Sequence, residues 1–550
     1  MVAMHVLSAA EMQACDRATT ERFGVPSILL MRAAAAAVAA FARAQFPQTR
    51  SVTVLCGRGN NGGDGMMAAR LLAEAGLDVT TLLLGPPEGL KGDAAEAWRE
   101  LTDPKQSQVH VIHAPGDLVR HKKALEADLI LDAVLGTGFK PPMRDLALAA
   151  LEWMRDAKAP VLAVDLPSGW PSDEASATIG EPHFPADAVV TFTAPKPAHV
   201  FGQLTRRWDQ PIVVAPIGSP EAAIVSVLAV DWAGSSMKLV QTPRAAAANK
   251  GNFGHVLVVG GTFGSAGGKA GAPAMASLAA MRAGAGLVTA AVPAPALPVV
   301  SSFAPEMMTC PLHATPAGAV SSRSLAPARL AALLEGKTVL AIGPGLGQSA
   351  ETAKFVLGLL SKTQIPAVVD ADALNILAGK SALLAKLSKK GKRVLVLTPH
   401  PGEMARLAGM TIVQVQANRL ETARGFAQRT GTTVVLKGAR TLIAHADGRV
   451  AVNTSGNPAM AKGGSGDLLT GLIAGLLAQH PTEAQRAVEA AVYLHGLAAD
   501  LAVYEGDEHT LLATDCLAQL ARAFQLKPDE LAIGGGNGYV WLQGHCMKQT

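Results

Sequence analysis

The feature that most constrains the fold is a repeated alternation of short, β-branched apolar runs with segments of helical periodicity. Runs such as "SVTVL", "ADLILDAVLG" and "APVLAVDLPSG" have the length of single strands. The segments between them are long enough for crossover helices, which parallel strands require. Residues 1–220 therefore predict an α/β fold with a parallel sheet covered by helices.

A second series of strand-like runs begins at "GHVLVVGG" and continues through "KTVLAIGPG" and "RVLVLTPHPGE". The stretch between the two series, "AVDWAGSSMKLVQTPRAAAANKGNFG", loses this rhythm. A chain of 550 residues is also too long for one hydrophobic core. We therefore predict two α/β domains, over residues 1–225 and 246–526, with a linker over 226–245 and an irregular tail over 527–550.

The composition excludes several classes of protein. A net charge of +4 without a basic block argues against a nucleic-acid partner. The five cysteines are scattered without a C-x-x-C pair, which favours reduced thiols over a disulfide or metal framework. The first residues mix acidic and basic side chains too early for a signal peptide. The longest uncharged run contains four prolines, so it does not predict a membrane span. We expect a soluble, cytoplasmic protein.

The loop "CGRGNNGGDG" at residues 56–65 has the G-x-G-x-x-G spacing of a dinucleotide-binding turn, in which backbone N–H groups approach a pyrophosphate. An ordinary turn of this kind also has an acid at the end of the next strand, which holds a ribose. Here Asp78 begins that strand, and the strand ends at Gly85 without an acid. Asp64, at the helix start, would repel a phosphate. A plain NAD-dependent dehydrogenase is therefore the weakest interpretation.

Polar side chains follow other strands of the first half. Asp132 ends "LILD", and Asp165 and Ser168 follow "VLAV". The carboxyl ends of parallel strands converge, so we expect one crevice to hold Asn60, Asn61, Asp64, Asp132, Asp165 and Ser168. Carboxylate, amide and hydroxyl oxygens suit a hard cation better than zinc. Capping of helices or turns remains the alternative role for Asp132 and Asp165.

The motifs "CGRGNNGGDGMMAAR", "DAVLGTGF", "AVDLPSG" and "TFTAPKP" resemble those of the YjeF N-terminal family, the NAD(P)H-hydrate epimerases, whose fold is a Rossmann-like three-layer sandwich. The resemblance covers about residues 5–220. It implies a catalytic role for Asp165 and a potassium ion held by Asn61, Asp132 and Ser168. The substrate-binding residues that it implies are Asn60, Asn61, Gly62, Gly63, Asp64, Gly136, Thr137, Gly138, Phe139, Lys140, Pro141, Pro142 and Asp165.

One stretch departs from that family's pattern. In "LMRAAAAAV", Arg32 stands where the family commonly has an acid, and Ala35 stands where it commonly has glycine. Because the crevice residues are intact, this departure bears on local packing or an interface more than on the reaction.

In the second half, Gly463, Gly464 and Gly466 precede or flank Asp467 at the start of an apolar helix. Glycines at a helix start expose N–H groups to an oxyanion, here a transferring phosphoryl group. Asp467 would then lie within reach of a hydroxyl that it could deprotonate. Simple N-capping explains the aspartate but not the three glycines. No GxxxxGK[ST] motif is present, which excludes P-loop chemistry.

Other strand ends add candidate groups. Lys437 in "VVLKGART" could meet nucleotide phosphates, although a lysine there is usually just solvated. His400 in "LTPHPGE" could bind a substrate amide or ribose, although a histidine beside proline is more often structural. Asp370 and Asp372 in "VVDADALN" could cap a helix or contact magnesium indirectly.

Together with "GGTFGSAGGKAGAP" and "GPGLG", these motifs resemble the ribokinase-like superfamily and, within it, the NAD(P)H-hydrate dehydratases, over about residues 246–525. The resemblance implies catalysis by Asp467, magnesium, and ADP rather than ATP as co-substrate. The implied hydrate-binding residues are Ala272, Gly347, His400 and Asp467. The implied nucleotide-binding residues are Lys437, Gly438, Ala439, Arg440, Thr441 and Gly466.

The two resemblances together imply a bifunctional enzyme. It would interconvert the R and S hydrates of NADH and NADPH, NADHX and NADPHX, and then dehydrate the S epimer at the expense of ADP. The partners expected are these small molecules, with no nucleic acid and no membrane, and a homo-oligomer is left open. The alternative is a ribokinase-like small-molecule kinase fused to a non-catalytic dinucleotide-binding domain.

Overall fold

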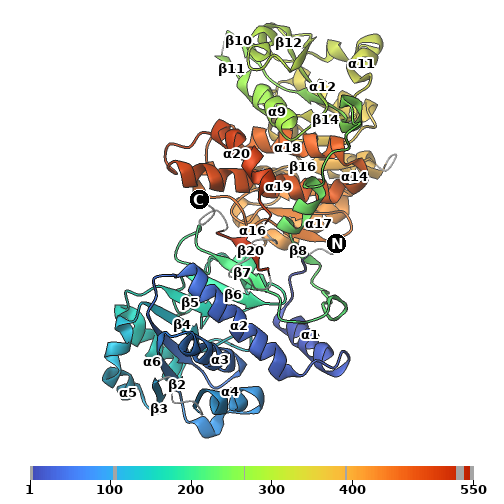
Figure 1. The fold of residues 1–550 in the computed structure, drawn as a ribbon. Coiled ribbons are helices and arrows are strands. Elements are labelled where there is room, and N and C mark those ends of the chain that lie inside the picture. The colour runs from blue at the N-terminus through green and yellow to red at the C-terminus, as the bar shows by residue number, and fades with distance from the viewer. Residues whose placement is uncertain (1–3, 103–107, 266, 390–392, 528–537, 545–550) are drawn as a thin grey trace. The chain divides into compact units, whose positions relative to one another are not determined.

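The computed structural model describes residues 4–102, 108–265, 267–389, 393–527 and 538–544. The chain divides into two compact units, each with its own sheet (Figure 1). Of the described residues, those from 4 to 230 together with 527 and 538–544 form the first unit, and those from 231 to 526 form the second unit. The prediction of two α/β domains with largely parallel sheets is therefore confirmed.

The first unit contains an eight-stranded sheet in the order β20-β7-β6-β5-β4-β1-β2-β3. All neighbouring strands are parallel except β20, which pairs antiparallel with β7. The strands are β1 (Ser51–Cys56), β2 (Asp78–Leu84), β3 (Gln108–Ile112), β4 (Leu129–Ala133), β5 (Val161–Val164), β6 (Ala188–Phe192), β7 (Ile212–Ala215) and β20 (Val540–Gln543).

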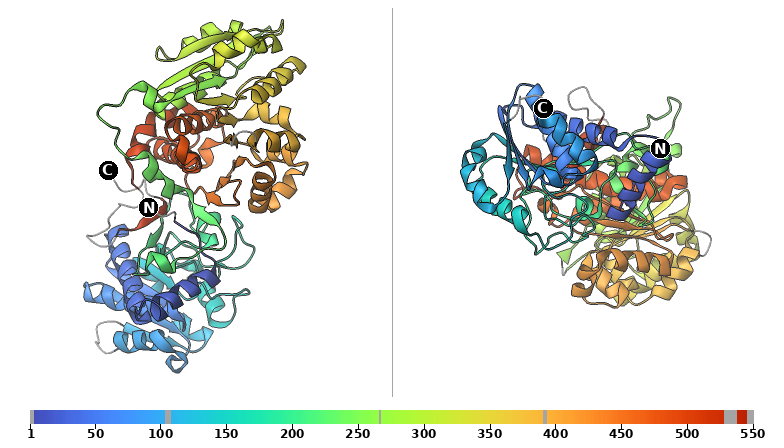
Figure 2. Two further views of the ribbon diagram at one scale, coloured as in Figure 1. Left: turned by 90° about the vertical axis from the view of Figure 1, so that its right-hand side faces the viewer. Right: turned by 90° about the horizontal axis from the view of Figure 1, so that it is seen from below.

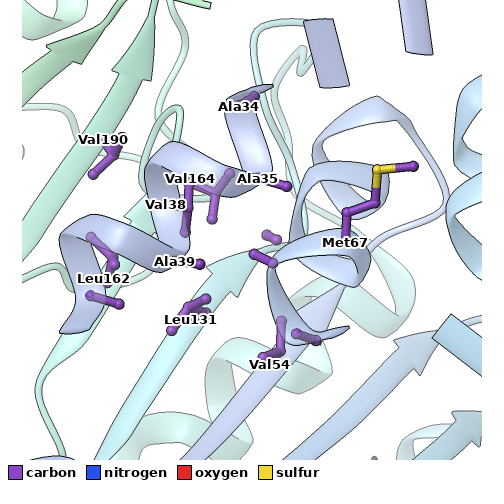
Figure 3. Packing of buried hydrophobic residues seen from close by; sticks show 14 of the residues in the cluster. Ala34, Ala35, Val38, Ala39, Val54, Met67, Leu131, Leu162, Val164 and Val190 are labelled. Carbon is purple, nitrogen blue, oxygen red and sulfur yellow. The ribbon is translucent and has the colours of Figure 1, made fainter. Parts of the chain in front are cut away.

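Helices cover both faces of this sheet, because successive strand residues point to opposite sides. Val54 belongs to the core cluster under α2, α3 and α4, whereas Leu55 belongs to the cluster under α5 and α6. Ala35 and Ala39 of α2 belong to the same core cluster as Leu131 and Leu162, and Figure 3 shows Ala39 beside Leu131. The helices are α1 (Ala9–Glu21), α2 (Ser27–Gln45), α3 (Asn60–Glu74), α4 (Gly92–Thr102), α5 (Pro115–Arg120), α6 (Asp145–Trp153) and α7 (Pro197–Phe201).

The prediction of an irregular tail is wrong for strand β20. Tyr539 and Trp541 are buried, and their rings contact the ring of Phe41 at centroid distances of 5.8 and 6.1 Å. The Tyr539 hydroxyl donates a 2.7 Å hydrogen bond to the carbonyl oxygen of Ala37. A four-residue edge strand is too short to give a periodic sequence pattern, so only its packing in the first unit reveals it.

The second unit is built on a ten-stranded sheet in the order β13-β12-β9-β14-β15-β16-β17-β18-β19-β8. The strands from β13 to β17 are parallel, and β18 and β19 add an antiparallel ribbon. They are β8 (Val230–Trp232), β9 (His255–Val259), β12 (Leu287–Pro293), β13 (Met308–Leu312), β14 (Val339–Ile342), β15 (Ala367–Val369), β16 (Leu395–Leu397), β17 (Thr433–Leu436), β18 (Leu442–Ala444) and β19 (Val450–Val452), with a small separate hairpin of β10 (Phe263–Gly264) and β11 (Gly267–Gly268).

Helices α18, α19 and α20 lie on one face of this sheet (Figures 1 and 2). Helix α18 packs closely on α9, and the absence of a side chain at Gly471 makes this possible. A Cβ there would lie only 2.0 Å from the carbonyl oxygen of Ala276. The helices are α8 (Met237–Val240), α9 (Gly271–Arg282), α10 (Leu297–Ser301), α11 (Pro327–Leu334), α12 (Ala350–Lys362), α13 (Ala371–Leu377), α14 (Ser381–Lys389), α15 (Pro401–Ala408), α16 (Ile412–Ala417), α17 (Arg419–Thr430), α18 (Ser465–Gln479), α19 (Ala484–Glu505) and α20 (Ala513–Gln525).

The predicted linker over 226–245 contains the division between the units, but much of it is folded. Strand β8 forms the edge of the second sheet beside β19. Trp232 is 2 % exposed, donates from Nε1 to the Thr454 hydroxyl over 2.8 Å and packs edge-on against Tyr493. The buried side chain of Trp232 holds this segment against the second unit. The sequence did not indicate this, because the segment lacks the alternation of strand-like and helical runs.

Two helical segments of the described chain, Ser27–Gln45 and Pro481–Glu505, are long and apolar enough to cross a membrane. The first packs on strands of its own sheet, and 89 % of the apolar window of the second is buried. For the first, 44 % of the apolar window is buried, so the second has the more complete packing of a core helix.

Candidate active sites

A cavity of about 970 Å³ lies at the carboxyl ends of β1, β2, β4, β5 and β6 in the first unit. Of the residues predicted for the epimerase site, it is lined by Asn60, Asn61, Asp64, Gly136, Thr137, Gly138, Phe139 and Asp165. The remaining predicted residues, Gly62, Gly63, Lys140, Pro141, Pro142, Asp132 and Ser168, are not among its lining residues.

Gly62 and Gly63 serve the close packing of helix α3. A Cβ at Gly62 would lie 1.9 Å from the carbonyl oxygen of Gly57, and one at Gly63 would lie 2.7 Å from the Met31 methyl carbon. Only glycine fits at position 62, where a Cβ would meet backbone, whereas a Cβ at position 63 would require the end of the Met31 side chain to shift. The two residues thus shape the start of α3, from which Asn60, Asn61 and Asp64 reach the cavity.

Asp165 is held in a buried network at the cavity wall. Its Oδ1 accepts hydrogen bonds from Lys196 Nζ and from the Thr191 hydroxyl, both over 2.8 Å. The side chain of Lys196 is 2 % exposed, and His199 Nε2 contacts the carbonyl oxygen of Asp165 at 2.7 Å. Burial would raise the pKa of Asp165, but Lys196, His199 and Thr191 together hold that pKa below its usual value.

The backbone at Asp165 has a φ of +66°, in the left-handed region. Residues held in this region by their surroundings cost conformational energy and cluster at functional sites. Here the carbonyl contact with His199 and the carboxylate contacts with Lys196 and Thr191 fix the conformation. The carboxylate is therefore ionised and held in position by hydrogen bonds.

Asp64 of α3 and Asp16 of α1 are among the further carboxyl groups that line the same cavity. Burial, followed by the charges of Asp165 and Asp16, raises the pKa of Asp64 well above its usual value. Burial also raises the pKa of Asp16, with Lys196 acting in the opposite direction. Asp64 and Asp165 therefore have pKa values shifted in opposite directions, which is the pattern expected of a proton donor and a proton acceptor.

Oxygen atoms cluster beside the cavity around Asp132 and Ser168. Ser168 donates from its backbone N–H and its hydroxyl to Asp132, over 2.7 and 2.5 Å. The amide nitrogen and oxygen of Asn61 are both buried without a hydrogen-bond partner, and a Cβ on Gly136 would lie 3.4 Å from the Asn61 oxygen. Burial raises the pKa of Asp132 to about 6, although its bonds to Ser168 act against this.

The cavity also has basic side chains that sequence reasoning missed. Arg17, Arg58 and Arg144 are exposed and line it, together with the buried Lys196. Lys196 belongs to the motif "TAPKP" and follows strand β6, so its place at a strand end was the available signal. The arginines come from α1 and from two different loops, so no spacing in the sequence connects them.

Arg32, the departure from the family pattern, does not line this cavity. Its Nη2 lies 3.0 Å from Glu96 and 2.6 Å from Glu100, two carboxylates on α4. Arg70 also lies 3.4 Å from Glu100. Arg32 of α2 therefore forms ion pairs with two glutamates of the neighbouring helix α4. The replacement of the family's usual acid by this arginine affects the surface between these two helices and not the cavity.

In the second unit, α18 begins at the predicted anion site. Gly464 precedes the helix with a φ of +93°, which glycine adopts without strain. A Cβ on Gly466 would lie 3.4 Å from Lys437 Nζ and 3.8 Å from Asp370 Oδ2. The helix N-terminus and the lysine ammonium therefore lie together, and both favour an anion.

Lys437 is fixed by acids rather than solvated. Its Nζ donates to Asp370 over 3.0 Å and lies 3.8 Å from Glu403. Burial would lower the pKa of Lys437, but Asp370 and Glu403 raise it, so the ammonium stays charged. Asp370 also accepts hydrogen bonds from Thr398 over 2.7 Å and Thr470 over 3.0 Å.

Asp467 lies in the first turn of α18. Burial, followed by the charge of Asp370, raises the pKa of Asp467 to about 6. Lys437 acts in the opposite direction. The carboxylate is thus ionised at neutral pH but basic enough to accept a proton from a hydroxyl.

His400 caps helix α15. Its Nδ1 accepts from the backbone N–H groups of Gly402 and Glu403 over 3.0 and 3.3 Å, so the ring proton lies on Nε2. Burial, followed by the charge of Lys437, lowers the pKa of His400. His400 Nε2 lies 3.4 Å from Glu403 Oε1, and because the side chain is 51 % exposed, the same Nε2–H can also reach a ligand.

Gly347 is held by its backbone N–H, which donates to Asp372 over 2.8 Å. Gly345 in the same loop approaches Ala272, because a Cβ there would lie 3.4 Å from the Ala272 Cβ. Lys269 Nζ lies 3.5 Å from Asp372. The structure thus brings the loops of the predicted hydrate-binding residues Ala272 and Gly347 together at the start of α9.

The predicted nucleotide loop, Lys437 to Thr441, is fastened by a residue that the sequence did not indicate. Arg419, at the start of α17, donates to the carbonyl oxygens of Leu436, Lys437 and Ala439. Its guanidinium occupies the space beside Gly438, which has a φ of +140°.

The loop is also held by two of its own residues. Arg440 has a φ of +55° and donates to the Thr454 carbonyl, and Thr441 donates to the Gly438 carbonyl over 2.9 Å.

Two family models match the chain. Residues 27–198 match a model described as YjeF-related protein N-terminus, and residues 256–522 match one described as NAD(P)H-hydrate dehydratase. A solved ADP/ATP-dependent NAD(P)H-hydrate dehydratase from Bacillus subtilis, co-crystallized with ATP/Mg2+, is 34 % identical. That alignment covers 52 % of this chain and 96 % of that chain, with a TM-score of 0.45.

Longer relatives span both units. The bifunctional NAD(P)H-hydrate repair enzyme Nnr of Moorella thermoacetica is 40 % identical over 94 % of this chain and 95 % of its own length. The enzyme of the same name from Escherichia coli is 33 % identical over 92 % of this chain and 91 % of its own length. The resemblance seen in the motifs is thereby confirmed. This chain belongs to the family of bifunctional NAD(P)H-hydrate repair enzymes.

Proposed function

We propose that the first unit interconverts the R and S hydrates of NADH and NADPH in the cavity lined by Asp64 and Asp165, and that the second unit dehydrates the S hydrate at the start of α18. The observation that carries the first assignment is the pair of oppositely shifted carboxyl groups in one cavity. The second rests on Asp467 beside Lys437 and a glycine-rich helix N-terminus.

Epimerisation requires the hydroxyl at C6 of the reduced ring to leave and water to return on the other face. The carboxyl of Asp64, whose pKa is raised, is suited to give a proton to the departing hydroxyl, whose bond electrons leave with the oxygen. The ring nitrogen supplies its lone pair to C6. The ionised Asp165 then takes a proton from the water that adds. Arg17 and Arg144 line the cavity and would bind the diphosphate of the dinucleotide.

The residues beside this cavity fit a potassium ion. Asn61 has a buried amide oxygen without a partner, and the carboxylate of Asp132 and the hydroxyl of Ser168 supply further oxygens. Hard cations prefer oxygen ligands of this kind over nitrogen or sulfur. An ion held by Asn61, Asp132 and Ser168 would offset the charge of the substrate phosphates.

In the second unit, Asp467 would take the proton of the S hydroxyl as its oxygen attacks the terminal phosphorus of ADP. The bond from that phosphorus to the bridging oxygen breaks and AMP leaves. The ring nitrogen then expels phosphate from C6, and loss of a proton from C5 restores NADH or NADPH. Lys437 and the N–H groups at the start of α18 stabilise the phosphoryl charge during the transfer.

Magnesium would accompany the nucleotide here, and the Bacillus subtilis dehydratase was co-crystallized with ATP/Mg2+. The oxygens of Asp370 already accept from Lys437, Thr398 and Thr470, and those of Asp372 accept from Gly347 and Gln348. These carboxylates suit a contact with the metal through water better than direct ligation. The use of ADP rather than ATP, and a cytoplasmic location, stay predictions.

The test is recovery of NADH absorbance from a mixture of R and S hydrates, with potassium, magnesium and either ADP or ATP. Full recovery with ADP is the expected result. Recovery of only the S fraction at the enzymatic rate would contradict the epimerase assignment. A stable phosphorylated product without phosphate release would favour the small-molecule kinase alternative.

A further inference from the structure

Arg58 occupies the place in the first cavity where the end of β2 meets the turn after β1. A Cβ on Gly85, the residue after β2, would lie 3.0 Å from Arg58 Cδ. A Cβ on Gly89 would lie 2.9 Å from Arg58 Nη1. The arginine therefore lies along the segment from Gly85 to Gly89, and the absence of side chains at these two glycines makes room for it.

The guanidinium of Arg58 has no hydrogen-bond or ion-pair partner among the described residues. The side chain is exposed, and it lines the cavity together with Gly85 and Pro86. An arginine carries five N–H donors in a planar fork that matches a phosphate. These donors are directed to a ligand or to solvent rather than to the protein.

The end of β2 has a defined role in parallel sheets that bind dinucleotides. An acid there holds the 2′-hydroxyl of the adenosine ribose, and an arginine there accommodates a 2′-phosphate. Strand β2 ends at Leu84 without an acid, and Glu88 is not among the lining residues of the cavity. Asp93 does line the cavity, but it begins α4 beside Asp64, to which its charge couples.

We propose that Arg58 binds the 2′-phosphate of hydrated NADPH, so that the first unit processes NADPHX more efficiently than NADHX. The inference rests on the proposed function, because it assumes that this cavity binds a hydrated dinucleotide. It names the substrate form that the cavity prefers. Without an acid at the end of β2, the ribose of NADHX gains no equivalent contact there.

The experiment compares epimerisation of R-NADHX and R-NADPHX by the full chain without ADP, with the epimers separated by chromatography. In Arg58→Gln, kcat/KM for NADPHX should fall on the order of tenfold to a hundredfold, because charge-assisted bonds to the phosphate are lost. The value for NADHX should change by less than about twofold. Arg58→Lys should retain part of the preference, because it keeps the charge but loses the fork.

Two further variants test whether Arg58 recognises the 2′-phosphate specifically or only adds positive charge that attracts any anionic substrate. Arg144→Gln should lower kcat/KM for both substrates alike, since Arg144 is assigned to the shared diphosphate. Arg99→Gln removes an exposed arginine of α4 that does not line the cavity, and it should leave both values unchanged. If Arg58→Gln lowered kcat/KM equally for both substrates, or lowered it for neither, the proposal would be overturned.

A binding measurement distinguishes failure of this proposal from failure of the proposed function. Adenosine 2′,5′-bisphosphate and AMP are titrated into the full chain by calorimetry, with the second unit saturated with ADP. The expected result is tighter binding of the bisphosphate, lost in Arg58→Gln. If the wild-type chain epimerises neither hydrate but still shows this preference, the epimerase assignment fails and the role of Arg58 stands. If the variant keeps the preference, the role of Arg58 is excluded.

Discussion

Lys196 donates a 2.8 Å hydrogen bond from Nζ to Oδ1 of Asp165, and both side chains are almost completely buried at the wall of one cavity. A buried ion pair is costly to assemble, and removal of one partner leaves an uncompensated charge. The pair therefore makes the state of Asp165 depend on Lys196. Two bonds of the Lys196 ammonium go to Asp165 and Thr191, which leaves one N–H for the cavity.

The first prediction concerns Lys196→Met. The cation that lowers the pKa of Asp165 is then lost while burial, which raises that pKa, remains. The acid limb of the epimerase pH profile should therefore move to higher pH, and kcat should fall on the order of a hundredfold. Because the wild-type pKa of Asp165 is lowered, the pair stabilises the fold at neutral pH and this stability is lost in acid, as Asp165 is protonated.

Lys196→Arg provides the matched control, since it keeps the charge and should retain the wild-type pH profile better than the methionine variant. Thermal unfolding and the dehydratase rate of the same protein report whether the chain is folded. A pH profile identical to that of the wild type in Lys196→Met would contradict the assignment.

The second prediction concerns Asp467, whose pKa is raised to about 6. A general base works in its ionised form, so kcat/KM for dehydration should fall as the pH drops below 6. At pH 5 it should be about tenfold lower than at pH 7. Asp467→Asn should reduce kcat on the order of a thousandfold and abolish this limb, while ADP binding persists. Epimerisation by the first unit serves as the internal control, and a flat dehydration profile in the wild type would contradict the base assignment.

The sequence predicted which polar residues meet at the ends of the parallel strands, but it did not predict how deeply each is buried or which partner it has. Asp132 and Ser168, 36 residues apart in the chain, are hydrogen-bonded as expected from two adjacent parallel strands. Lys196 also follows a strand, but a lysine at such a place is usually solvated, and only the fold shows that this one is buried beside Asp165. Arg419 fastens the nucleotide loop from another helix, a relationship that no local spacing encodes.

The third prediction concerns potassium. If Asn61, Asp132 and Ser168 hold the ion, potassium chloride should raise the melting temperature of the wild-type chain by a few degrees relative to choline chloride, because a ligand of the native state stabilises it. Asn61→Leu should remove this difference and the dependence of epimerisation on potassium. The dehydratase rate of Asn61→Leu in excess S hydrate should match the wild type. A potassium effect of full size in this variant would exclude Asn61 as a ligand.

The fourth prediction concerns strand β20. Trp541 is 7 % exposed and contacts Phe41, so Trp541→Ala should cost about 3–5 kcal/mol of unfolding free energy in the first unit. Gln543 adds hydrogen bonds to Thr205 over 3.1 Å and to the carbonyl of Gln210 over 2.9 Å. A chain that ends at residue 527 should therefore lose epimerase activity at a lower temperature than the full chain, although no β20 residue lines the cavity.

The measurement is the temperature at which each activity is lost, followed separately for epimerisation and dehydration. Val540 is only partly buried, so Val540→Thr should change the unfolding free energy by less than about 1 kcal/mol and provides the matched control. Because β20 pairs with β7 of the first unit, its loss should lower the epimerase midpoint and leave the dehydratase midpoint near that of the full chain. Equal midpoints for epimerisation in the full and shortened chains would mean that the first sheet is stable without its last strand.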